Sequence, residues 1–479
     1  MNVRRAKIVC TLGPASRSPE MIDQLMRAGL DVARLNFSHG THEEHAKVIA
    51  DLRAISARHE KPIAILADLQ GPKIRTGLLE GAKPVELRTG QRFTITTKTI
   101  KGNVQGVSTT YKPLPEEVQK GDRILLADGL IELRVRGVRG DTVETEVING
   151  GELGQNKGIN LPGVKLKISA LTAKDRADLA FAMTQPVNYI ALSFARRPED
   201  VQTAKRAIAK LGKDTPVIAK LEKPEAIENL DAILEVADGV MVARGDLGVE
   251  MNPEQVPVVQ KRIIARARDA RRPVITATQM LESMTLNPRP TRAEASDVAN
   301  AIFDGTDAVM LSGETASGKY PVLAVAMMDR IIREAEASMA NQRDRRRRPA
   351  EHMSVAETIS ESVCHAADEL HMKVIAVFTE TGSTARLISK HRPRSPIVAF
   401  SANQETRRRL QLFWGVNPRT IKQVKDIDSL TALAESRLLE EGVVKKGDVV
   451  GLVAGTPLGV KGTTNFMKLH VVGQLAAKK

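Results

Sequence analysis

The chain has 479 residues, of which 42% are hydrophobic and 3% aromatic, and its 71 basic and 57 acidic side chains give a net charge of +14. The length predicts two to four domains, and the hydrophobic content excludes a wholly disordered chain. So few aromatic residues argue against a protein that stacks single-stranded nucleic acid on aromatic side chains. The Arg-rich segment 343–348 carries +4 of the charge and the rest is dispersed, which suits anionic small molecules as well as nucleic acid.

The two cysteines, Cys10 and Cys364, lie inside apolar runs. They provide neither a disulfide framework nor a cysteine-based zinc site, so we expect buried thiols in a reducing compartment. The apolar run near the basic N-terminus covers only residues 8–12, which is too short for a signal peptide and predicts a strand. No stretch approaches the roughly 20 apolar residues of a membrane span. We therefore expect a cytoplasmic protein with no membrane partner.

Short β-branched apolar runs recur along the chain, and each is followed by an amphipathic stretch with helical spacing. This alternation predicts parallel strands joined by helices. Eight such units, with a last helix over residues 321–339, predict a (β/α)8 TIM barrel. Ser18 and Pro19 mark one helix start, as N-cap and first-turn proline. The eight predicted strands begin near Lys7, Val32, Ile63, Asn188, Pro216, Gly239, Pro273 and Ala308.

The third and fourth of these strands are separated by 125 residues, whereas the other intervals are 23–35 residues. The excess contains short alternating segments at 94–97, 123–126 and 142–145 and Gly-Asp pairs typical of turns, which predict a small inserted β-barrel. An insert at the carboxyl end of a barrel strand is positioned as a lid. We thus predict a catalytic barrel (1–70 and 167–342), an inserted lid domain (71–166), a solvated Arg-rich linker (343–349) and a C-terminal open α/β domain (350–479) with strands at 373–379, 448–455 and 468–472.

Residues that perform chemistry in such a barrel lie at the carboxyl ends of its strands. Alternation along the second strand places Arg34, Asn36 and Ser38 on one face. Polar groups on a core strand need partners, and an arginine among them favours a phosphate or carboxylate ligand. A structural hydrogen-bond network is the alternative. The third strand is followed by a carboxylate, an ammonium and a guanidinium, those of Asp68, Lys73 and Arg75, for which a hinge salt bridge is the alternative.

Charged residues also end the fifth and sixth strands. A spacing of two places Lys220 and Glu222 on one face, and Asp246 follows the next strand. Because neighbouring strands lie about 4.8 Å apart, Glu222 and Asp246 can share one divalent cation. Mg²⁺ is usually held by one or two carboxylates together with substrate oxygens. The alternative is that each acid simply pairs with Lys220 or Arg244.

The turn after the sixth strand, residues 244–248, contains two glycines that let backbone N–H groups approach an anion. The seventh strand ends at Thr278 and the eighth at residues 312–315, which add hydroxyl groups and Glu314. A barrel mouth that combines Arg34, Lys220, a Mg²⁺ site and an anion-binding turn below a lid predicts phosphoryl transfer, or enolate chemistry on an α-keto acid.

Several of these segments together resemble pyruvate kinase, in the same order and over essentially the whole chain. They are residues 7–16, 34–40, 238–250, 277–284 and 310–315. The resemblance implies Mg²⁺-dependent transfer of the phosphoryl group of phosphoenolpyruvate to ADP, which gives ATP and pyruvate in the last step of glycolysis. It allows Mn²⁺ as a substitute for Mg²⁺, and it suggests a homotetramer.

The resemblance also implies a role for each matching residue. Lys220 would neutralise charge on the phosphoryl group and on the enolate, and Arg34 would clamp the phosphoryl group. Thr278 would position the water that delivers a proton. The remaining implied roles are Mg²⁺ binding by Glu222 and Asp246, substrate carboxylate binding by the N–H groups of Gly245 and Asp246, and nucleotide binding by Asn36, His39, Arg75 and Lys157.

One departure from the family concerns monovalent cations. Many members carry Asp-Thr-Lys-Gly-Pro-Glu where residues 68–73 of this chain read Asp-Leu-Gln-Gly-Pro-Lys. In those members a K⁺ ion is bound by the equivalents of Asn36, Ser38 and Asp68, beside the position of Leu69. Lys73 replaces the glutamate, so we expect its ammonium to supply the missing positive charge and to fill the pocket of Asn36, Ser38, Asp68 and Leu69. We therefore predict activity without added K⁺, as in the Lys-bearing bacterial subset of the family.

The C-terminal domain carries Thr-Glu-Thr-Gly-Ser-Thr at residues 379–384, between a predicted strand and a predicted helix. Hydroxyls and a glycine at a helix N-terminus suit a phosphate, and in the family this segment is the allosteric effector loop. Glu380 argues against tight bisphosphate binding, so a sugar monophosphate or nucleoside monophosphate is expected, with an ordinary capped helix as the alternative. The phosphate-binding residues are predicted to be Thr379, Thr381, Gly382, Ser383 and Thr384.

Two other classes of function compete with this interpretation. A barrel with two acids, Mg²⁺ and an arginine also serves carbon–carbon lyases that act on pyruvate enolates, although the lid, Lys220 and Arg75 argue against it. The net charge suggests a nucleic-acid-binding protein, which salt-dependent retention on DNA would reveal. The dispersed charge and low aromatic content argue against that class, so we expect no nucleic-acid partner.

Overall fold

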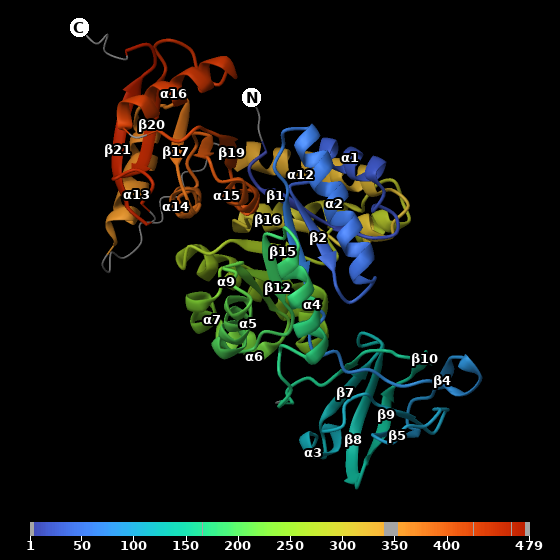
Figure 1. Cartoon of the computed structure of the whole chain (residues 1–479). Coiled ribbons are helices and arrows are strands. Elements are labelled where there is room, and N and C mark those ends of the chain that lie inside the picture. Colours follow the sequence, from blue (N-terminus) through green and yellow to red (C-terminus); the bar gives the residue numbers. More distant parts are fainter. Residues whose placement is uncertain (1–3, 165, 340–352, 425, 461, 475–479) are drawn as a thin grey trace.

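The computed structural model describes residues 4–164, 166–339, 353–424, 426–460 and 462–474. The Arg-rich linker predicted at 343–349 therefore lies outside the described residues. In Figure 1 a central barrel separates the inserted segment, drawn in teal, from the C-terminal domain, drawn in orange and red. None of the helices in the described part of the chain is long and apolar enough to cross a membrane.

The predicted eight-stranded barrel is confirmed. The strands run parallel and close in the order β1-β16-β15-β14-β13-β12-β3-β2, and each begins within one residue of its predicted start. The barrel has two hydrophobic cores, one inside the ring of strands and one between the ring and the helices. Successive residues of a strand alternate between them: Val9 packs inside the ring, whereas Ile8 packs against the helices. The strands are β1 (Lys7–Leu12), β2 (Val32–Asn36), β3 (Ala64–Asp68), β12 (Tyr189–Leu192), β13 (Val217–Leu221), β14 (Gly239–Ala243), β15 (Val274–Ala277) and β16 (Ala308–Leu311).

Helices surround this ring, as helical crossovers between parallel strands require. The predicted start at Ser18 is confirmed, since its side chain accepts a hydrogen bond from the Met21 N–H and Pro19 follows in the first turn. The helices are α1 (Pro19–Ala28), α2 (His42–Arg58), α4 (Ala173–Thr184), α5 (Pro198–Lys210), α6 (Pro224–Glu228), α7 (Leu230–Val236), α8 (Arg244–Glu250), α9 (Val256–Asp269), α10 (Arg292–Asp304), α11 (Gly313–Ala316) and α12 (Pro321–Met339).

The segment between β3 and β12 folds into β structure, as predicted. Its strands form a six-stranded sheet, β11-β7-β8-β9-β5-β6, and a two-stranded sheet, β10-β4, which share one hydrophobic core. Bridges from Arg75 to Gly158, beside β11, and from Thr76 to Thr109, beside β6, join the two edges of the six-stranded sheet and close the predicted small barrel. The elements are β4 (Val85–Leu87), β5 (Arg92–Thr96), β6 (Gly106–Ser108), α3 (Leu114–Glu117), β7 (Arg123–Leu126), β8 (Ile131–Arg139), β9 (Thr142–Asn149), β10 (Gly151–Leu153) and β11 (Ile159–Asn160).

The C-terminal part is an open α/β domain, as predicted. Its sheet has the order β19-β18-β17-β20-β21, and only β21 runs antiparallel to its neighbour. The domain boundaries drawn from the sequence remain predictions. The elements are α13 (Val355–Glu369), β17 (Val374–Phe378), α14 (Ser383–Lys390), β18 (Ile397–Ser401), α15 (Gln404–Arg409), β19 (Val416–Thr420), α16 (Ile427–Glu440), β20 (Val449–Gly455) and β21 (Thr464–Val471).

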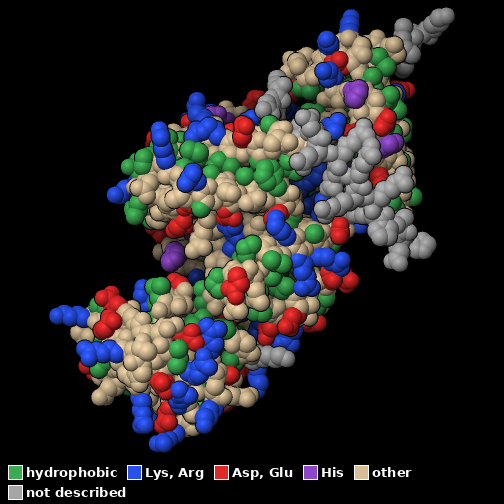
Figure 2. Space-filling view, turned by 180° about the vertical axis from the view of Figure 1, so that it is seen from behind, with side chains coloured by type: hydrophobic (Ala, Val, Ile, Leu, Met, Phe, Trp, Pro, Cys, Tyr) green, Lys and Arg blue, Asp and Glu red, His purple; other side chains and the backbone are tan. Residues whose placement is uncertain are grey.

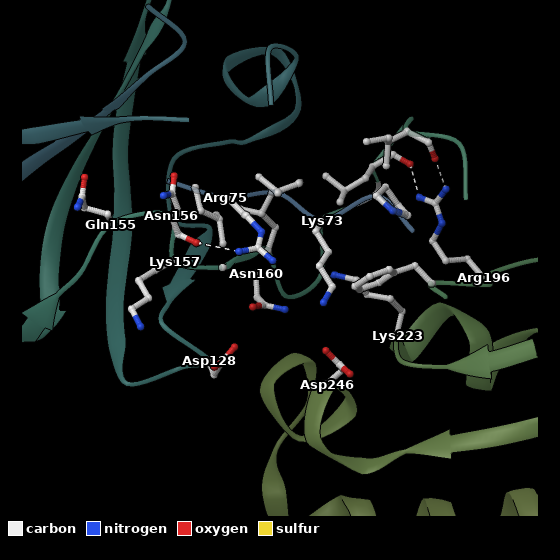
Figure 3. A pocket seen from close by; sticks show the side chains of 18 residues that line it. Lys73, Arg75, Asp128, Gln155, Asn156, Lys157, Asn160, Arg196, Lys223 and Asp246 are labelled. Atoms are coloured by element: carbon white, nitrogen blue, oxygen red, sulfur yellow. Dashed lines mark hydrogen bonds between the residues drawn. The ribbon is translucent and has the colours of Figure 1, made fainter. Parts of the chain in front are cut away.

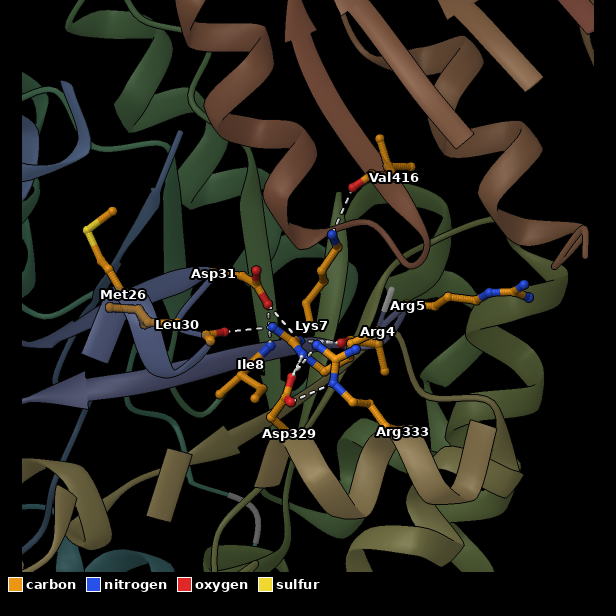
Figure 4. Close-up of polar contacts among 12 residues, drawn as sticks. Arg4, Arg5, Lys7, Ile8, Met26, Leu30, Asp31, Asp329, Arg333 and Val416 are labelled. Carbon is orange, nitrogen blue, oxygen red and sulfur yellow. Dashed lines mark hydrogen bonds and ion pairs between the residues drawn. The ribbon is translucent and has the colours of Figure 1, made fainter. Parts of the chain in front are cut away.

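Buried charges join the amino end of the barrel to the C-terminal domain (Figure 4). Lys7 at the start of β1 donates to the Val416 carbonyl at 2.8 Å, and burial lowers the pKa of Lys7 to about 8. Arg4 pairs with Asp31 at 2.8 Å and with Asp329 at 2.7 Å. A cavity of about 490 Å³ lies beside these groups. The Lys7–Val416 hydrogen bond joins the C-terminal domain to the end of the barrel opposite the strand tips that were predicted to carry the chemistry, and the Arg4 pairs hold that end of the barrel together.

The distribution of surface charge and the burial of the two cysteines agree with the expectations from the sequence. On the face seen in Figure 2, basic side chains are spread among acidic ones, and a hollow separates the inserted segment from the barrel. Cys10 and Cys364 are both free and buried, and burial raises the pKa of each thiol. Both cysteines are therefore unreactive thiols in the protein core.

Candidate active site

A buried lysine forms the centre of a charge cluster at the carboxyl ends of the barrel strands. Lys220 on β13 lies with its Nζ 2.8 Å from a Glu222 oxygen and 3.4 Å from an Asp68 oxygen. The same Nζ donates to the Ser193 hydroxyl at 2.8 Å. Burial alone would lower the pKa of Lys220, but the carboxylates of Asp68 and Glu222 outweigh it and raise that pKa. Lys220 is therefore a fixed positive charge.

Asp68 at the end of β3 links this lysine to Arg34 on β2. The Arg34 Nε donates to Asp68 at 2.6 Å, and its Nη1 donates to the Thr11 hydroxyl at 2.8 Å. Burial would raise the pKa of Asp68, but Lys220 and Arg34 hold it below its ordinary value. Asp68 thus stays ionised and fixes both cations at the mouth of the barrel.

Glu222 and Asp246 form the predicted pair of carboxylates. Burial, together with the charge of Asp246, raises the pKa of Glu222 to about 7, although Lys220 acts in the opposite direction. Asp246, in the first turn of α8, points into the space below the insert (Figure 3). The described residues contain no group of three or more Asp, Glu, His or Cys side chains placed to hold a metal. Two carboxylates fit a Mg²⁺ ion that takes its other ligands from substrate and water. The alternative was that each acid pairs with Lys220 or Arg244, and Glu222 does pair with Lys220.

A cavity of about 440 Å³ lies between the insert and the barrel (Figure 3). The barrel contributes Asp246 and Lys223, and Glu250 at the end of α8 binds both Lys223 and the Asn160 amide of the insert. The Arg196 guanidinium donates to the carbonyls of two residues in the chain that returns from the insert. The insert is therefore tied to the barrel on both sides of the cavity. Its lining includes Lys73, Arg75, Asp128, Gln155, Asn156, Lys157, Asn160, Phe194, Arg196, Lys223 and Asp246.

The residues predicted to meet a nucleotide lie on two sides of this region. Arg75 and Lys157 belong to the insert side of the cavity, where the Arg75 Nη1 donates to the Asn156 carbonyl at 3.2 Å. Asn36 ends β2, and its side-chain oxygen accepts from the Ser38 N–H at 3.1 Å. Burial lowers the pKa of His39, and so do the neighbouring cations, which include Arg75. His39 is therefore neutral at pH 7 and lies close to the positively charged groups.

Lys73, the residue predicted to replace a monovalent cation, lines the cavity. Among the described residues, its ammonium has no hydrogen-bond or ion-pair partner. Burial and the charge of Lys220 lower its pKa, while Asp246 and Glu222 act in the opposite direction. Asp68 is already bound by Arg34 and Lys220, and the Leu69 carbonyl accepts from Ser193 at 2.7 Å. That Lys73 fills the monovalent-cation pocket formed by Asn36, Ser38, Asp68 and Leu69 stays a prediction.

The Gly245 N–H, which was predicted to bind an anion, already has a hydrogen-bond partner within the protein. The Gly245 N–H donates to the Thr278 hydroxyl at 2.7 Å, and that hydroxyl donates to the Ala277 carbonyl at 2.6 Å. Thr278 has φ +69° and Gln279 has φ +53°, a left-handed conformation that a β-branched residue rarely adopts. A substrate carboxylate that binds the Gly245 N–H must therefore share it with Thr278 or displace it.

Several groups that hold this cluster were not predicted from the sequence. Thr11 lies near the end of β1 and Ser193 directly follows β12, and the Phe194 N–H donates to Glu222 at 2.6 Å. Phe194 has φ +55°, a conformation in which this N–H reaches Glu222. A polar residue one position before the end of the first strand, and another directly after the fourth, were the available signals.

The predicted phosphate loop of the C-terminal domain leads into α14, of which Ser383 and Thr384 are the first two residues. Gly382 has φ +90°, and its N–H donates to the Thr379 hydroxyl at 2.9 Å. The Thr384 hydroxyl lies 2.6 Å from that of Thr464. The Thr381 hydroxyl, which is exposed, donates to Ser383 at 3.1 Å. The hydrogen bonds of the Thr379 and Thr384 hydroxyls are thus buried, whereas the one between Thr381 and Ser383 is exposed and accessible.

Comparison with known proteins gives the family of this chain. Residues 3–325 match the model of the pyruvate kinase barrel domain, and residues 357–470 match that of the pyruvate kinase alpha/beta domain. The chain belongs to the pyruvate kinase family. It is therefore a phosphotransferase whose substrates are phosphoenolpyruvate and ADP and whose products are pyruvate and ATP, and this family generally uses Mg²⁺.

Both sequences and structures support this assignment. Pyruvate kinase from Sporosarcina psychrophila is 46% identical, over 99% of this chain and 82% of that protein. The enzyme from Staphylococcus saprophyticus is 48% identical with the same coverage. The crystal structure of a pyruvate kinase from Cryptosporidium parvum superposes with a TM-score of 0.92 at 39% identity, over 98% of this chain and 96% of that one. The lyase and nucleic-acid-binding alternatives are therefore discarded.

Proposed function

We propose that the cluster around Lys220 transfers the phosphoryl group of phosphoenolpyruvate to ADP. The observation that carries this proposal is the Lys220 ammonium, held between Asp68 and Glu222, with Arg34 fixed on the other side of Asp68. Phosphoryl transfer is catalysed mainly by positioning and by fixed charges that face the transferred group. Pyruvate formation that consumes ADP tests this function, because an enolate lyase would cleave a carbon–carbon bond without using ADP.

Different charged residues bind each of the two substrates. Arg34 binds the phosphoryl oxygens of phosphoenolpyruvate, and Lys220 neutralises the charge of the transferred group and then of the enolate oxygen. Arg75 and Lys157 bind the phosphates of ADP from the insert side, with Asn36 and His39 on the barrel side. The insert covers this space and limits the access of water, which strengthens each electrostatic contact.

Glu222 and Asp246 are the residues that would hold Mg²⁺, with Mn²⁺ as a substitute. A bound divalent cation supplies charge neutralisation at phosphate and enolate oxygens. The N–H groups of Gly245 and Asp246 bind the substrate carboxylate, in exchange for the hydrogen bond that Gly245 now makes to Thr278. The freed Thr278 hydroxyl then orients the water that protonates the enolate.

We further propose that the enzyme needs no added K⁺, because Lys73 already places a positive charge in this region. The rate of pyruvate formation is expected to change less than about twofold when tetramethylammonium replaces K⁺. The Lys73→Glu variant should gain a requirement for K⁺ of at least about tenfold in rate, since a carboxylate there needs a compensating cation. A more than tenfold K⁺ activation of the unmodified enzyme would discard the role of Lys73.

An allosteric site for a monophosphate is proposed at residues 379–384. The accessible hydroxyls of Thr381 and Ser383 at the start of α14 support a phosphate there. At subsaturating phosphoenolpyruvate, glucose 6-phosphate or AMP is expected to raise the initial rate, and fructose 1,6-bisphosphate is expected to act more weakly because Glu380 lies in the loop. The combined Thr381→Ala and Ser383→Ala variant should lose this response. If none of the three compounds shifts the rate, the loop is an ordinary helix cap.

The family resemblance supports two further proposals. The chain assembles as a homotetramer, which light scattering of the purified protein can measure, and it works in the cytoplasm. The two buried, unpaired cysteines fit a reducing compartment.

A further inference from the structure

The loop after β15 is held from two sides by buried charged groups. On one side, the Arg244 Nη2 donates to the Thr278 carbonyl at 2.6 Å and its Nε donates to the Ala277 carbonyl at 3.2 Å. On the other side, the Leu281 N–H donates to Glu314 at 3.0 Å. A cation thus binds the carbonyls of the loop, and a carboxylate binds one of its amides.

This loop needs such support because two successive residues are left-handed. Thr278 and Gln279 have φ values of +69° and +53°. A residue without a glycine's freedom keeps this conformation only where surrounding contacts impose it. The Thr278 carbonyl that Arg244 binds and the Thr278 hydroxyl that faces Gly245 belong to the same strained residue. The guanidinium therefore controls where that hydroxyl lies.

Arg244 is itself fixed and does not reach the substrates. Its Nη1 pairs with Asp297 on α10 at 2.7 Å and donates to Gln260 on α9 at 3.4 Å. Its side chain is 11% exposed, and it is not among the residues that line the cavity. It begins α8, directly before Gly245 and Asp246. One side chain thus connects the turn that carries Asp246 with the loop that carries Thr278.

We propose that Arg244 is a positioning residue that holds Thr278 in the conformation required for protonation of the enolate. This inference rests on the role of Thr278 given above. Lysine preserves the charge at this position but cannot bind two carbonyls and Asp297 together, because it lacks the planar fork of donors. The Arg244→Lys variant should therefore misplace the hydroxyl while leaving the substrate charges intact.

Three effects are expected for Arg244→Lys. The kcat for pyruvate formation falls by about 10- to 100-fold, as for a small misplacement of a reacting group, while the KM for ADP changes less than about twofold. The exchange of pyruvate methyl protons for deuterium from D₂O, with Mg²⁺ and ATP present, falls at least as much as kcat. Arg266→Lys is the matched control, because Arg266 pairs with Asp231 at 2.8 Å on the outer helices. It should leave both rates unchanged.

The decisive experiment is a double-mutant cycle with Thr278→Ala, read by both kcat and proton exchange. If Arg244 acts through Thr278, the double variant loses no more than about twofold beyond Thr278→Ala alone. Independent, multiplicative losses would overturn the proposal, and so would an Arg244→Lys variant with normal proton exchange. Full activity of Thr278→Ala alone would instead remove the proposed role of Thr278. Asp297→Asn, which frees the guanidinium without changing it, gives a second variant should Arg244→Lys fail to fold, and it should show a smaller loss of the same kind.

Discussion

Replacing Lys220 with methionine is expected to lower the rate of pyruvate formation by at least about 10³-fold, the order of effect seen when a fixed catalytic charge is removed. Lys220 is the cation that touches both Asp68 and Glu222. Methionine fills similar space but leaves two buried carboxylates without their common partner. The transferred phosphoryl group and the enolate oxygen would then face net negative charge. Initial rates at saturating phosphoenolpyruvate, ADP and Mg²⁺ measure this loss.

The same change should also lower the melting temperature, because removing one member of a buried ion pair leaves an uncompensated charge in the core. Circular dichroism at the assay temperature separates loss of chemistry from loss of fold. Lys205→Met is the control, since Lys205 pairs with Asp238 at 2.9 Å on the outside of the barrel. A folded Lys220→Met enzyme within tenfold of the unmodified rate would show that Lys220 is structural.

Replacing Asp246 with asparagine is expected to weaken Mn²⁺ binding by about 10- to 100-fold, because a carboxylate ligand becomes a neutral amide. Asp246 points into the cavity, and its charge raises the pKa of Glu222. Mn²⁺ binding can be followed by the electron paramagnetic resonance signal of the free ion, in the presence of phosphoenolpyruvate and without turnover. The Mg²⁺ concentration needed for half-maximal activity should rise in parallel.

Asp128 provides a matched control for this experiment, because it is a second carboxylate that lines the same cavity but belongs to the insert. Asp128→Asn should leave Mn²⁺ affinity within about twofold of the unmodified protein. Equal losses from the two substitutions would indicate a general effect of negative charge. The assignment of Glu222 and Asp246 as the metal site would then be wrong.

The barrel could be predicted from the sequence because its strands are buried on both faces and read as short apolar runs. The charged residues that interrupt these runs stood out for the same reason: Lys220 is a charged residue within a strand of otherwise apolar residues. Strand spacing then placed Glu222 and Asp246 on neighbouring tips. The types of residue and their order along the chain were sufficient to predict the barrel and the charged residues at its strand tips.

Side-chain partners were less predictable, since they depend on contacts between residues far apart in the chain. The Thr278 hydroxyl accepts the hydrogen bond of the Gly245 N–H from a residue with a left-handed backbone. No local feature of the sequence predicts that conformation for a threonine. Likewise, both oxygens of Asp68 are engaged by Arg34 and Lys220, which lie on other strands of the barrel. Ser193 differs from these cases, because its place after the fourth strand was visible in the sequence.

The transfer itself can be observed most directly by ³¹P nuclear magnetic resonance. The unmodified enzyme would be mixed with phosphoenolpyruvate, ADP and Mg²⁺ in a buffer whose only monovalent cation is tetramethylammonium. The account predicts that the phosphoenolpyruvate signal is replaced by the γ-phosphate signal of ATP in equal amount, without inorganic phosphate. Release of inorganic phosphate, or no loss of phosphoenolpyruvate while the protein is folded, would contradict it.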